Sequence, residues 1–186
     1  MRITGGEYRG RLLQSPKDRT IRPTSDKVRQ AIFNILGSRI DLEGISVLDA
    51  FCGTGALGIE ALSRGALCCT FMDKNGGSLG LAEENFAALK IAAQHSFVLK
   101  DATKAGPKPD TIAAANLVFL DPPYKQDLIA PSLSALGAAG WIAAGAHILV
   151  ESENSYDPTG LSGLGYDVLM VRDYGDKRIA LLKRED

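Results

Sequence analysis

Hydrophobic residues recur with a helical period early in the chain, in the segment "RPTSDKVRQAIFNILG" that covers residues 22–37. They lie on one helix face, at positions i, i+3, i+4, i+7 and i+8: Val28, Ala31, Ile32, Ile35 and Leu36. This spacing predicts an amphipathic helix with Thr24 or Ser25 as its N-cap and Gly37 as its stop. Residues 1–16 before it predict a short hairpin that turns at Gly5-Gly6.

From residue 45 onward, the pattern changes to short hydrophobic runs separated by helical stretches. Five runs are hydrophobic on both faces: "ISVLD", "LCCTFMD", "SFVLKD", "LVFLD" and "HILVE". Such runs are typical of a parallel sheet covered by helices, and the helices are expected near residues 56–64, 77–90 and 126–137. Residues 166–185 predict two further strands that turn at 174–176. The expected α/β fold is therefore a mostly parallel seven-stranded sheet with helices on both faces and an antiparallel C-terminal hairpin.

Each of the first four runs ends in an aspartate: Asp49, Asp73, Asp101 and Asp121. Ligands of open α/β sheets bind beyond the carboxyl ends of the strands, so these carboxylates should line one crevice and favour a cation. The first run continues into a glycine loop with the spacing G-x-G-x-x-G, at Gly53, Gly55 and Gly58. Phe51 is expected to touch a cofactor there, because its neighbours in the loop are glycines.

The glycine loop alone does not distinguish NAD from another adenosine cofactor. Asp73 lies twenty residues after Gly53, the usual spacing of a ribose-binding carboxylate in either case. Asp49 favours S-adenosylmethionine, because a carboxylate repels a pyrophosphate at short range but attracts a sulfonium and an ammonium group. The structural alternative is that Asp49 and Asp101 only cap backbone amides. A NAD-type oxidoreductase, or a binding module that has kept only the nucleotide fold, remains an alternative.

The fourth run leads into the sequence "DPPY", Asp121 to Tyr124. Pro122 and Pro123 fix the backbone and remove two amide donors, which leaves acceptors facing the crevice. Acceptors beside an aromatic ring suit a flat nucleobase with an exocyclic amine, which stacks on Tyr124 and donates to Asp121 and the Pro122 carbonyl. The sequence therefore predicts methyl transfer to a base amine, with Asp121, Pro122, Pro123 and Tyr124 as the catalytic element.

Composition and charge indicate which kinds of partner the protein can bind. The chain has 186 residues and a net charge of −1, yet residues 1–30 carry an excess of five positive charges, which favours an anionic partner. Three cysteines without a ligand pattern argue against a metal, and no hydrophobic run is long enough for a membrane span. We expect a cytoplasmic, monomeric protein of one domain, 1–186, in which residues 1–23 form a basic arm.

Four segments give the chain its resemblance to a known family: "MRITGGEYRGRLL", "RPTSDKVRQAIFNIL", "LDAFCGTGALGIEALSRGA" and "LDPPY". With the strand and helix order between them, the chain resembles the RsmD type of 16S ribosomal RNA (guanine-N2)-methyltransferase, whose product is 2-methylguanine at position 966. The resemblance implies a Rossmann-like class I fold and S-adenosylmethionine as cofactor. The implied substrate is 16S rRNA, within a small-subunit particle or assembly intermediate.

The resemblance also implies roles for individual residues. Asp49, Gly53 and Gly55 fall in the loop that holds the methionine part of the cofactor, Asp73 takes the ribose hydroxyls and Asp101 lies near the adenine. Residues 121–124 hold the target guanine. Six basic residues of the arm are expected to contact RNA phosphates: Arg2, Arg9, Arg11, Lys17, Arg19 and Arg22.

The chain departs from the family at two places. The family usually has Glu where this chain has Asp73, and an unbroken helix where it has Gly76-Gly77. Glycines inside a helix cost about 1 kcal/mol each, which puts cofactor affinity in question more than function. Methylation of adenine N6 in DNA uses the same type of motif and remains an alternative, although 186 residues leave little room for a DNA-recognition region.

Overall fold

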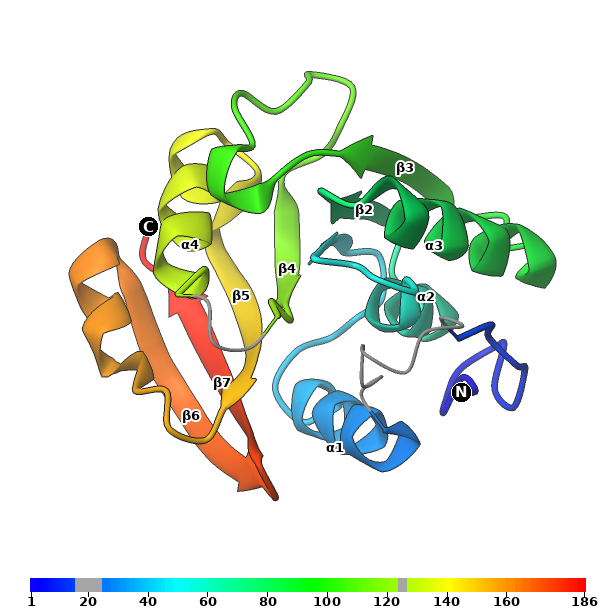
Figure 1. Cartoon of the computed structure of the whole chain (residues 1–186), viewed down its shortest axis with the longest axis horizontal. Helices are drawn as coiled ribbons and strands as arrows, with labels where there is room; N and C mark the ends of the chain where they lie inside the picture. Colours follow the sequence, from blue (N-terminus) through cyan, green and yellow to red (C-terminus); the bar gives the residue numbers. More distant parts are fainter. Residues whose placement is uncertain (16–24, 124–126) are drawn as a thin grey trace.

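The computed structural model describes residues 1–15, 25–123 and 127–186, and within these ranges seven strands form one sheet (Figure 1). The strands are β1 (Ser46–Ala50), β2 (Cys68–Asp73), β3 (Gln94–Leu99), β4 (Ala115–Leu120), β5 (Ile142–Glu153), β6 (Tyr166–Tyr174) and β7 (Lys177–Arg184). Their order is β3-β2-β1-β4-β5-β7-β6, and only the pairs that include β7 are antiparallel. The predicted architecture is confirmed. The strand order reverses between β1 and β4, where the carboxyl ends of a doubly wound sheet form a binding crevice.

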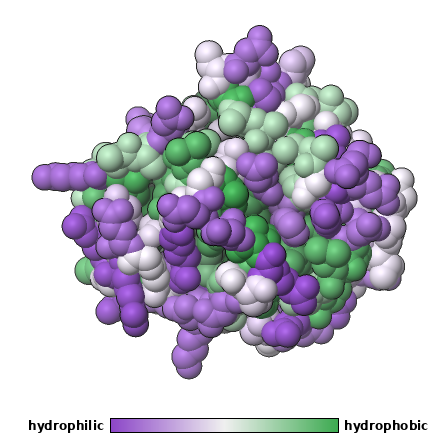
Figure 2. Space-filling model, turned by 180° about the vertical axis from the view of Figure 1, so that it is seen from behind, coloured by the Kyte–Doolittle hydropathy of each residue, from purple (hydrophilic) through white to green (hydrophobic). Residues whose placement is uncertain are grey.

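Helices cover both faces of the sheet (Figure 1). They are α1 (Asp26–Gly37), α2 (Ala56–Ser63), α3 (Gly76–Leu89) and α4 (Ile129–Ala138), with the 3₁₀ helices η1 (Ala102–Lys104) and η2 (Pro158–Leu164). One hydrophobic core lies under α1, α2 and α3, and a second lies under α4, η1 and η2. Figure 2 shows a surface on which hydrophobic side chains form separate patches between hydrophilic ones. Within the described residues, no helix has the length and hydrophobicity needed to cross a membrane.

Local sequence signals explain where the helices begin. Ser25 caps α1, since its side chain accepts a hydrogen bond from the Val28 amide at 3.3 Å. Asn75 caps α3 by accepting from the amides of Gly77, at 2.8 Å, and Ser78, at 3.1 Å. The glycine pair therefore occupies the first turn of α3, where N–H groups need a cap partner, and does not interrupt the helix interior.

The N-terminal hairpin differs from its prediction. A single antiparallel bridge joins Arg2 and Leu12, and the chain turns through a wider loop rather than at Gly5-Gly6 alone. The reason is a close approach to α2: a Cβ on Gly6 would lie 1.7 Å from the Ser63 carbonyl oxygen, and the φ of Gly6 is +76°. This glycine serves docking onto α2.

Two strands also differ from their predicted limits. β5 begins at Ile142, five residues before the run "HILVE". The prediction missed this start because the residues between are small and include Gly145, so they do not form a hydrophobic run. β3 ends at Leu99 rather than at Asp101. It is the edge strand, and Leu99 is 61% exposed, so this run is not buried on both faces.

Candidate functional site

The loop between β1 and α2 has a backbone that ordinary residues rarely adopt. Phe51, Gly53 and Gly55 have φ values of 63°, 53° and 74°. The turn closes through a 2.7 Å hydrogen bond from the Gly55 amide to the Cys52 carbonyl. Phe51 is one of two non-glycine residues with positive φ in the described chain, and such strain often accompanies a binding site.

Gly58 is required for close packing of α2 on the sheet, and not for an unusual backbone conformation. A Cβ at this position would lie 2.5 Å from Cε1 of Phe71 and 2.6 Å from Sγ of Cys69, both on β2. The absence of a side chain therefore lets the first turn of α2 lie directly on the sheet. The three glycines have different roles. The first two allow the left-handed turn, and the third allows close helix packing.

Asp49 and Asp73 hold this loop through backbone amides. Asp49 is buried and accepts a hydrogen bond from the Gly58 amide at 2.9 Å. Asp73 accepts from the Gly53 amide at 3.0 Å and from the Asn75 amide at 2.9 Å. The two carboxylates that the sequence predicts as cofactor ligands thus hold the backbone of the loop in place.

Burial raises the pKa of Asp49 well above its ordinary value of 3.8, and the nearby carboxylates of Asp121 and Asp73 raise it further. Only the hydrogen bond from Gly58 favours the charged form. Two of the other three predicted carboxylates therefore act on Asp49 at the end of β1. A site of this kind favours a cationic ligand, whose charge would relieve the repulsion.

Asp101 lies just beyond β3 and is the N-cap of η1. Its Oδ1 accepts from the Thr103 amide at 2.9 Å and from the Thr103 hydroxyl at 2.7 Å. These bonds lower the pKa of Asp101, so the carboxylate stays charged. The capping alternative is confirmed for Asp101, and its predicted place near the adenine stays a prediction. The second oxygen, Oδ2, has no hydrogen-bond partner among the described residues and keeps its acceptor capacity.

Asp121 follows directly after β4, which pairs with β1 in the centre of the sheet. The register pairs Asp49 with Phe119 and Ala50 with Leu120, so Asp121 lies one residue beyond the paired ends of β1 and β4. Pro122 is buried and Pro123 is exposed, so the dipeptide passes from the interior to the surface at the carboxyl end of β4. Tyr124 lies outside the described residues, so its predicted stacking role stays a prediction. In the described part of the chain, no group of three or more His, Cys, Asp or Glu is arranged to hold a metal ion.

Asn85 on α3 was not identified from the sequence, although it joins two parts of the site. It is 1% exposed, and its Nδ2 donates to the carbonyls of Thr54, at 3.0 Å, and Gln14, at 3.2 Å. Its Oδ1 accepts from the Gln14 amide at 2.7 Å. One buried amide thus connects the glycine loop to the N-terminal segment. A polar residue at a buried helix position is the sequence signal that could have revealed it.

The basic residues predicted to bind RNA are only partly within the described chain. Arg2, Arg9 and Arg11 are exposed, whereas three lie outside the described residues: Lys17, Arg19 and Arg22. Arg11 is partly engaged, because it donates to the Leu89 carbonyl at 3.3 Å and its guanidinium lies 5.7 Å from the ring centre of Tyr8.

A buried ion cluster fixes the N-terminal segment against the helices. Glu60 is fully buried and accepts from the amide and hydroxyl of Thr4 at 2.8 and 2.7 Å. It also pairs with Arg64 at 2.9 Å and with Arg29 at 3.4 Å. Arg29, in turn, donates to the carbonyl of Arg2. Removing one member would leave a buried charge without compensation, so the cluster sets the position of the segment.

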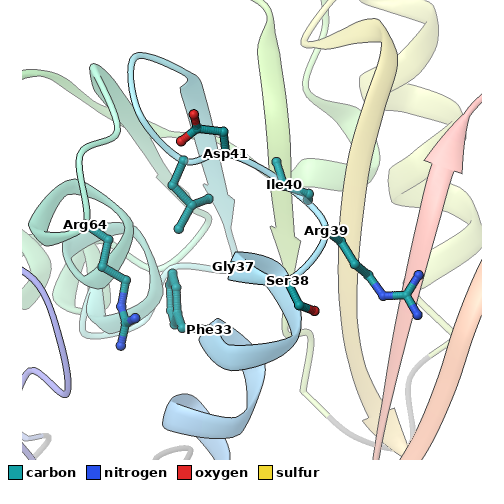
Figure 3. A pocket seen from close by; sticks show the side chains of 8 residues that line it. Phe33, Gly37, Ser38, Arg39, Ile40, Asp41 and Arg64 are labelled. Atoms are coloured by element: carbon teal, nitrogen blue, oxygen red, sulfur yellow. The ribbon is translucent and has the colours of Figure 1, made fainter.

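A pocket of about 490 Å³ lies at the C-terminal end of α1 (Figure 3). Its lining residues are Phe33, Gly37, Ser38, Arg39, Ile40, Asp41, Leu42 and Arg64. Arg64 is at the C-terminal end of α2, whereas Gly53 and Gly55 precede the N-terminal end of this helix. At 1.5 Å per residue the two ends are roughly 12 Å apart. This pocket is therefore separate from the glycine loop.

The strand order, the strained loop after β1 and the carboxylates at the strand ends define the Rossmann-like class I fold of S-adenosylmethionine-dependent methyltransferases. The family described as conserved hypothetical protein 95 matches residues 1–183. The chain belongs to this family and is an RsmD-type methyltransferase.

Individual relatives agree with this assignment. The chain is 39% identical to ribosomal RNA small subunit methyltransferase D of Escherichia coli K12, over 82% of this chain and 75% of that protein. It is 32% identical to the putative rRNA methyltransferase YlbH of Bacillus subtilis, over 99% of both chains. Among solved structures, the putative methyltransferase yhhF from Escherichia coli superposes with a TM-score of 0.80 at 31% identity, over 100% of this chain and 98% of that one. These relatives support methylation of ribosomal RNA.

Proposed function

We propose that the protein transfers a methyl group from S-adenosylmethionine to the exocyclic N2 amine of a guanine in 16S ribosomal RNA, the position 966 type of reaction. The observation that carries this proposal is the position of Asp121-Pro122-Pro123. The element follows β4, whose Phe119 lies opposite Asp49 and whose Leu120 lies opposite Ala50, so Asp121 comes directly beyond the end of β1. This position supports the proposal, because acceptors for a base amine would then lie beside carboxylates that favour a cation.

The residues present fit the methyl donor. Asp49 and Asp73 provide negative charge against a sulfonium and an ammonium group, and Asp73 retains acceptor capacity for ribose hydroxyls beside its two backbone bonds. Oδ2 of Asp101 suits an adenine amine. Phe51 and Gly53 bring backbone close to the ligand, as the left-handed turn requires.

In the proposed reaction, Asp121 and the Pro122 carbonyl each accept a hydrogen bond from the N2 amine. These two bonds direct the nitrogen lone pair at the methyl carbon. A new nitrogen–carbon bond forms as the sulfur–carbon bond of the donor breaks. The proton then leaves the methylated amine through Asp121 or water. Positioning is the main catalytic contribution, because in-line transfer from a sulfonium needs no further activation. The role of Tyr124 as a stacking platform remains part of the proposal.

The test supplies labelled S-adenosylmethionine and small ribosomal subunits from a strain that lacks this enzyme. Label should appear in 2-methylguanine of the 16S RNA. Protein-free 16S RNA, duplex DNA and NADH serve as parallel arms, because transfer to adenine in DNA, or thermal stabilisation by NADH alone, would contradict the proposal.

The Asp121→Ala variant should lose turnover and keep its affinity for S-adenosylmethionine. Asp110→Ala is the matched control, since Asp110 is exposed and follows η1 by several residues. Equal loss of turnover and cofactor affinity in Asp121→Ala would mean that Asp121 only shapes the crevice.

A further inference from the structure

A second concave surface lies between α1 and β6, on the sheet face that α1 covers. It has a volume of about 280 Å³ and is lined by Ala31, Asn34, Ile35, Ser38, Arg39, Met170, Arg172 and Tyr174. We call this surface the α1–β6 groove. The lining includes two arginines and no carboxylate.

The two arginines are available for an external partner. Arg39 and Arg172 are both exposed, and neither forms an ion pair with any described residue. Figure 3 shows Arg39 directed away from Arg64, toward the C-terminal strands of the sheet. By contrast, Arg178 on the same hairpin is held by Asp173 at 2.7 and 2.9 Å. In the groove, this hairpin thus presents an arginine whose charge no described carboxylate neutralises.

Strand register places Arg172 level with the catalytic element. Leu120, the residue before Asp121, is opposite Val150. The next residue on β5, Glu151, is opposite Ile179, and Ile179 is opposite Arg172. Arg172 is therefore three strands from Asp121 at the same height, a separation of about 14 Å at the usual strand spacing. A nucleic-acid strand that leaves the crevice covers this distance in a few nucleotides.

The chemistry of the groove suits a sugar-phosphate backbone. Arginine binds phosphate oxygens in a fixed fork geometry. Asn34 adds a side-chain amide whose Oδ1 accepts from Gln30 at 3.0 Å, leaving its Nδ2 as a donor. The half-buried ring of Tyr174 forms one wall. The absence of a carboxylate from the lining removes the main source of repulsion for an anion.

We propose that the α1–β6 groove binds the backbone of the substrate RNA a few nucleotides from the target guanine, with Arg39 and Arg172 as its phosphate contacts. This inference rests on the proposed function and adds a second RNA contact, distinct from the basic arm.

The experiment measures binding of protein-free 16S RNA by the full chain as a function of salt, without turnover. The affinity falls as salt rises, and each single-strand phosphate contact contributes about 0.7 to the steepness of log K against log salt. Replacement of both residues, Arg39→Ala with Arg172→Ala, should therefore make this slope shallower by about 1.4. Arg172→Lys should restore most of the slope for its position, because the charge remains. Thermal stability and affinity for S-adenosylmethionine should equal those of the wild type.

Lys183→Ala is the matched control. Lys183 is exposed on the same hairpin, but it pairs with His147 on β5, toward the amino ends of the parallel strands. Its removal should leave the salt slope unchanged. An unchanged slope in the double arginine variant, or an equal decrease in Lys183→Ala, would overturn the proposal.

Turnover on small ribosomal subunits separates the remaining outcomes. The double variant should raise KM for subunits and leave kcat close to the wild-type value. A raised KM with unaltered binding to protein-free RNA would assign the groove to a ribosomal protein and overturn the RNA assignment. If the wild-type protein methylates no subunit, the proposed function fails, whereas the salt slope still decides whether the groove binds RNA.

Discussion

Gly58 offers a direct test of how the glycine loop is held against the sheet. In Gly58→Ala, the new Cβ would lie 2.5 Å from the Phe71 ring and 2.6 Å from the Cys69 sulfur. These distances are about 1 Å shorter than favourable contacts between such atoms. Phe71 and Cys69 are almost fully buried in the first core, so neither can move into solvent. The first turn of α2 must therefore move away from β2.

Two opposing effects determine the stability of Gly58→Ala. Overpacking a well-filled core costs about 1–3 kcal/mol, whereas alanine in place of a helical glycine gains about 1 kcal/mol. The clash prevails, and a net loss of about 1 kcal/mol is expected, or about 2–4 °C in Tm for a domain of this size. Gly80→Ala is the control, since Gly80 is inside α3 and its added Cβ meets no atom within 4 Å. This variant should gain about 0.5–1 kcal/mol.

The assay is thermal unfolding of the two variants beside the wild type, followed by titration with S-adenosylmethionine. The Tm values should move in opposite directions. Affinity for the donor should fall only in Gly58→Ala, because displacement of α2 disturbs the 2.9 Å bond from the Gly58 amide to Asp49. If Gly58→Ala is as stable as Gly80→Ala, close helix packing is not the reason for glycine at this position.

Two further substitutions test the polar contacts of the site. Asn85→Leu removes three hydrogen bonds to Gln14 and Thr54. We expect the free energy of unfolding, measured in urea, to fall by about 1–3 kcal/mol, because each bond contributes about 1 kcal/mol net. Water replaces part of the bonds to Gln14, which is exposed. Unchanged stability would show that the N-terminal segment docks without Asn85. Asp49→Asn keeps an acceptor for Gly58 and removes the buried charge. Because the folded-state pKa of Asp49 is raised, wild-type stability falls as pH rises above the ordinary value of 3.8, so the advantage of the variant should grow with pH. A stability difference that stays constant between pH 4 and 7 would contradict this assignment.

The fold could be predicted because each core element has a periodic hydrophobic pattern of its own. The α1 segment places its buried residues at helical spacing, and the central strands are continuous hydrophobic runs. The limits of β3 and β5 were missed for a different reason. The edge position that exposes half of β3 is a property of the assembled sheet. So is the irregular register between Ile142 and His147 at the start of β5.

The candidate site could be predicted only where chain order determines proximity. Asp49, Asp73 and Asp121 are brought together because parallel strands end at the same edge of the sheet. Asn85 forms hydrogen bonds across 71 residues of sequence. The α1–β6 groove joins two elements from opposite ends of the chain. No local pattern encodes contacts of this kind.

The structural and functional interpretations of the aspartates are compatible rather than competing. Asp49, Asp73 and Asp101 each accept backbone amide hydrogen bonds, and the same bonds orient carboxylate oxygens at the end of the sheet before any ligand arrives. Such fixed acceptors need little rearrangement on binding a cation, which is an energetic advantage over free side chains. Alanine at these positions consequently removes a loop anchor and a charge together. Asparagine keeps an acceptor and removes only the charge, so a comparison of the two substitutions at one position separates loop stability from attraction of the methyl donor.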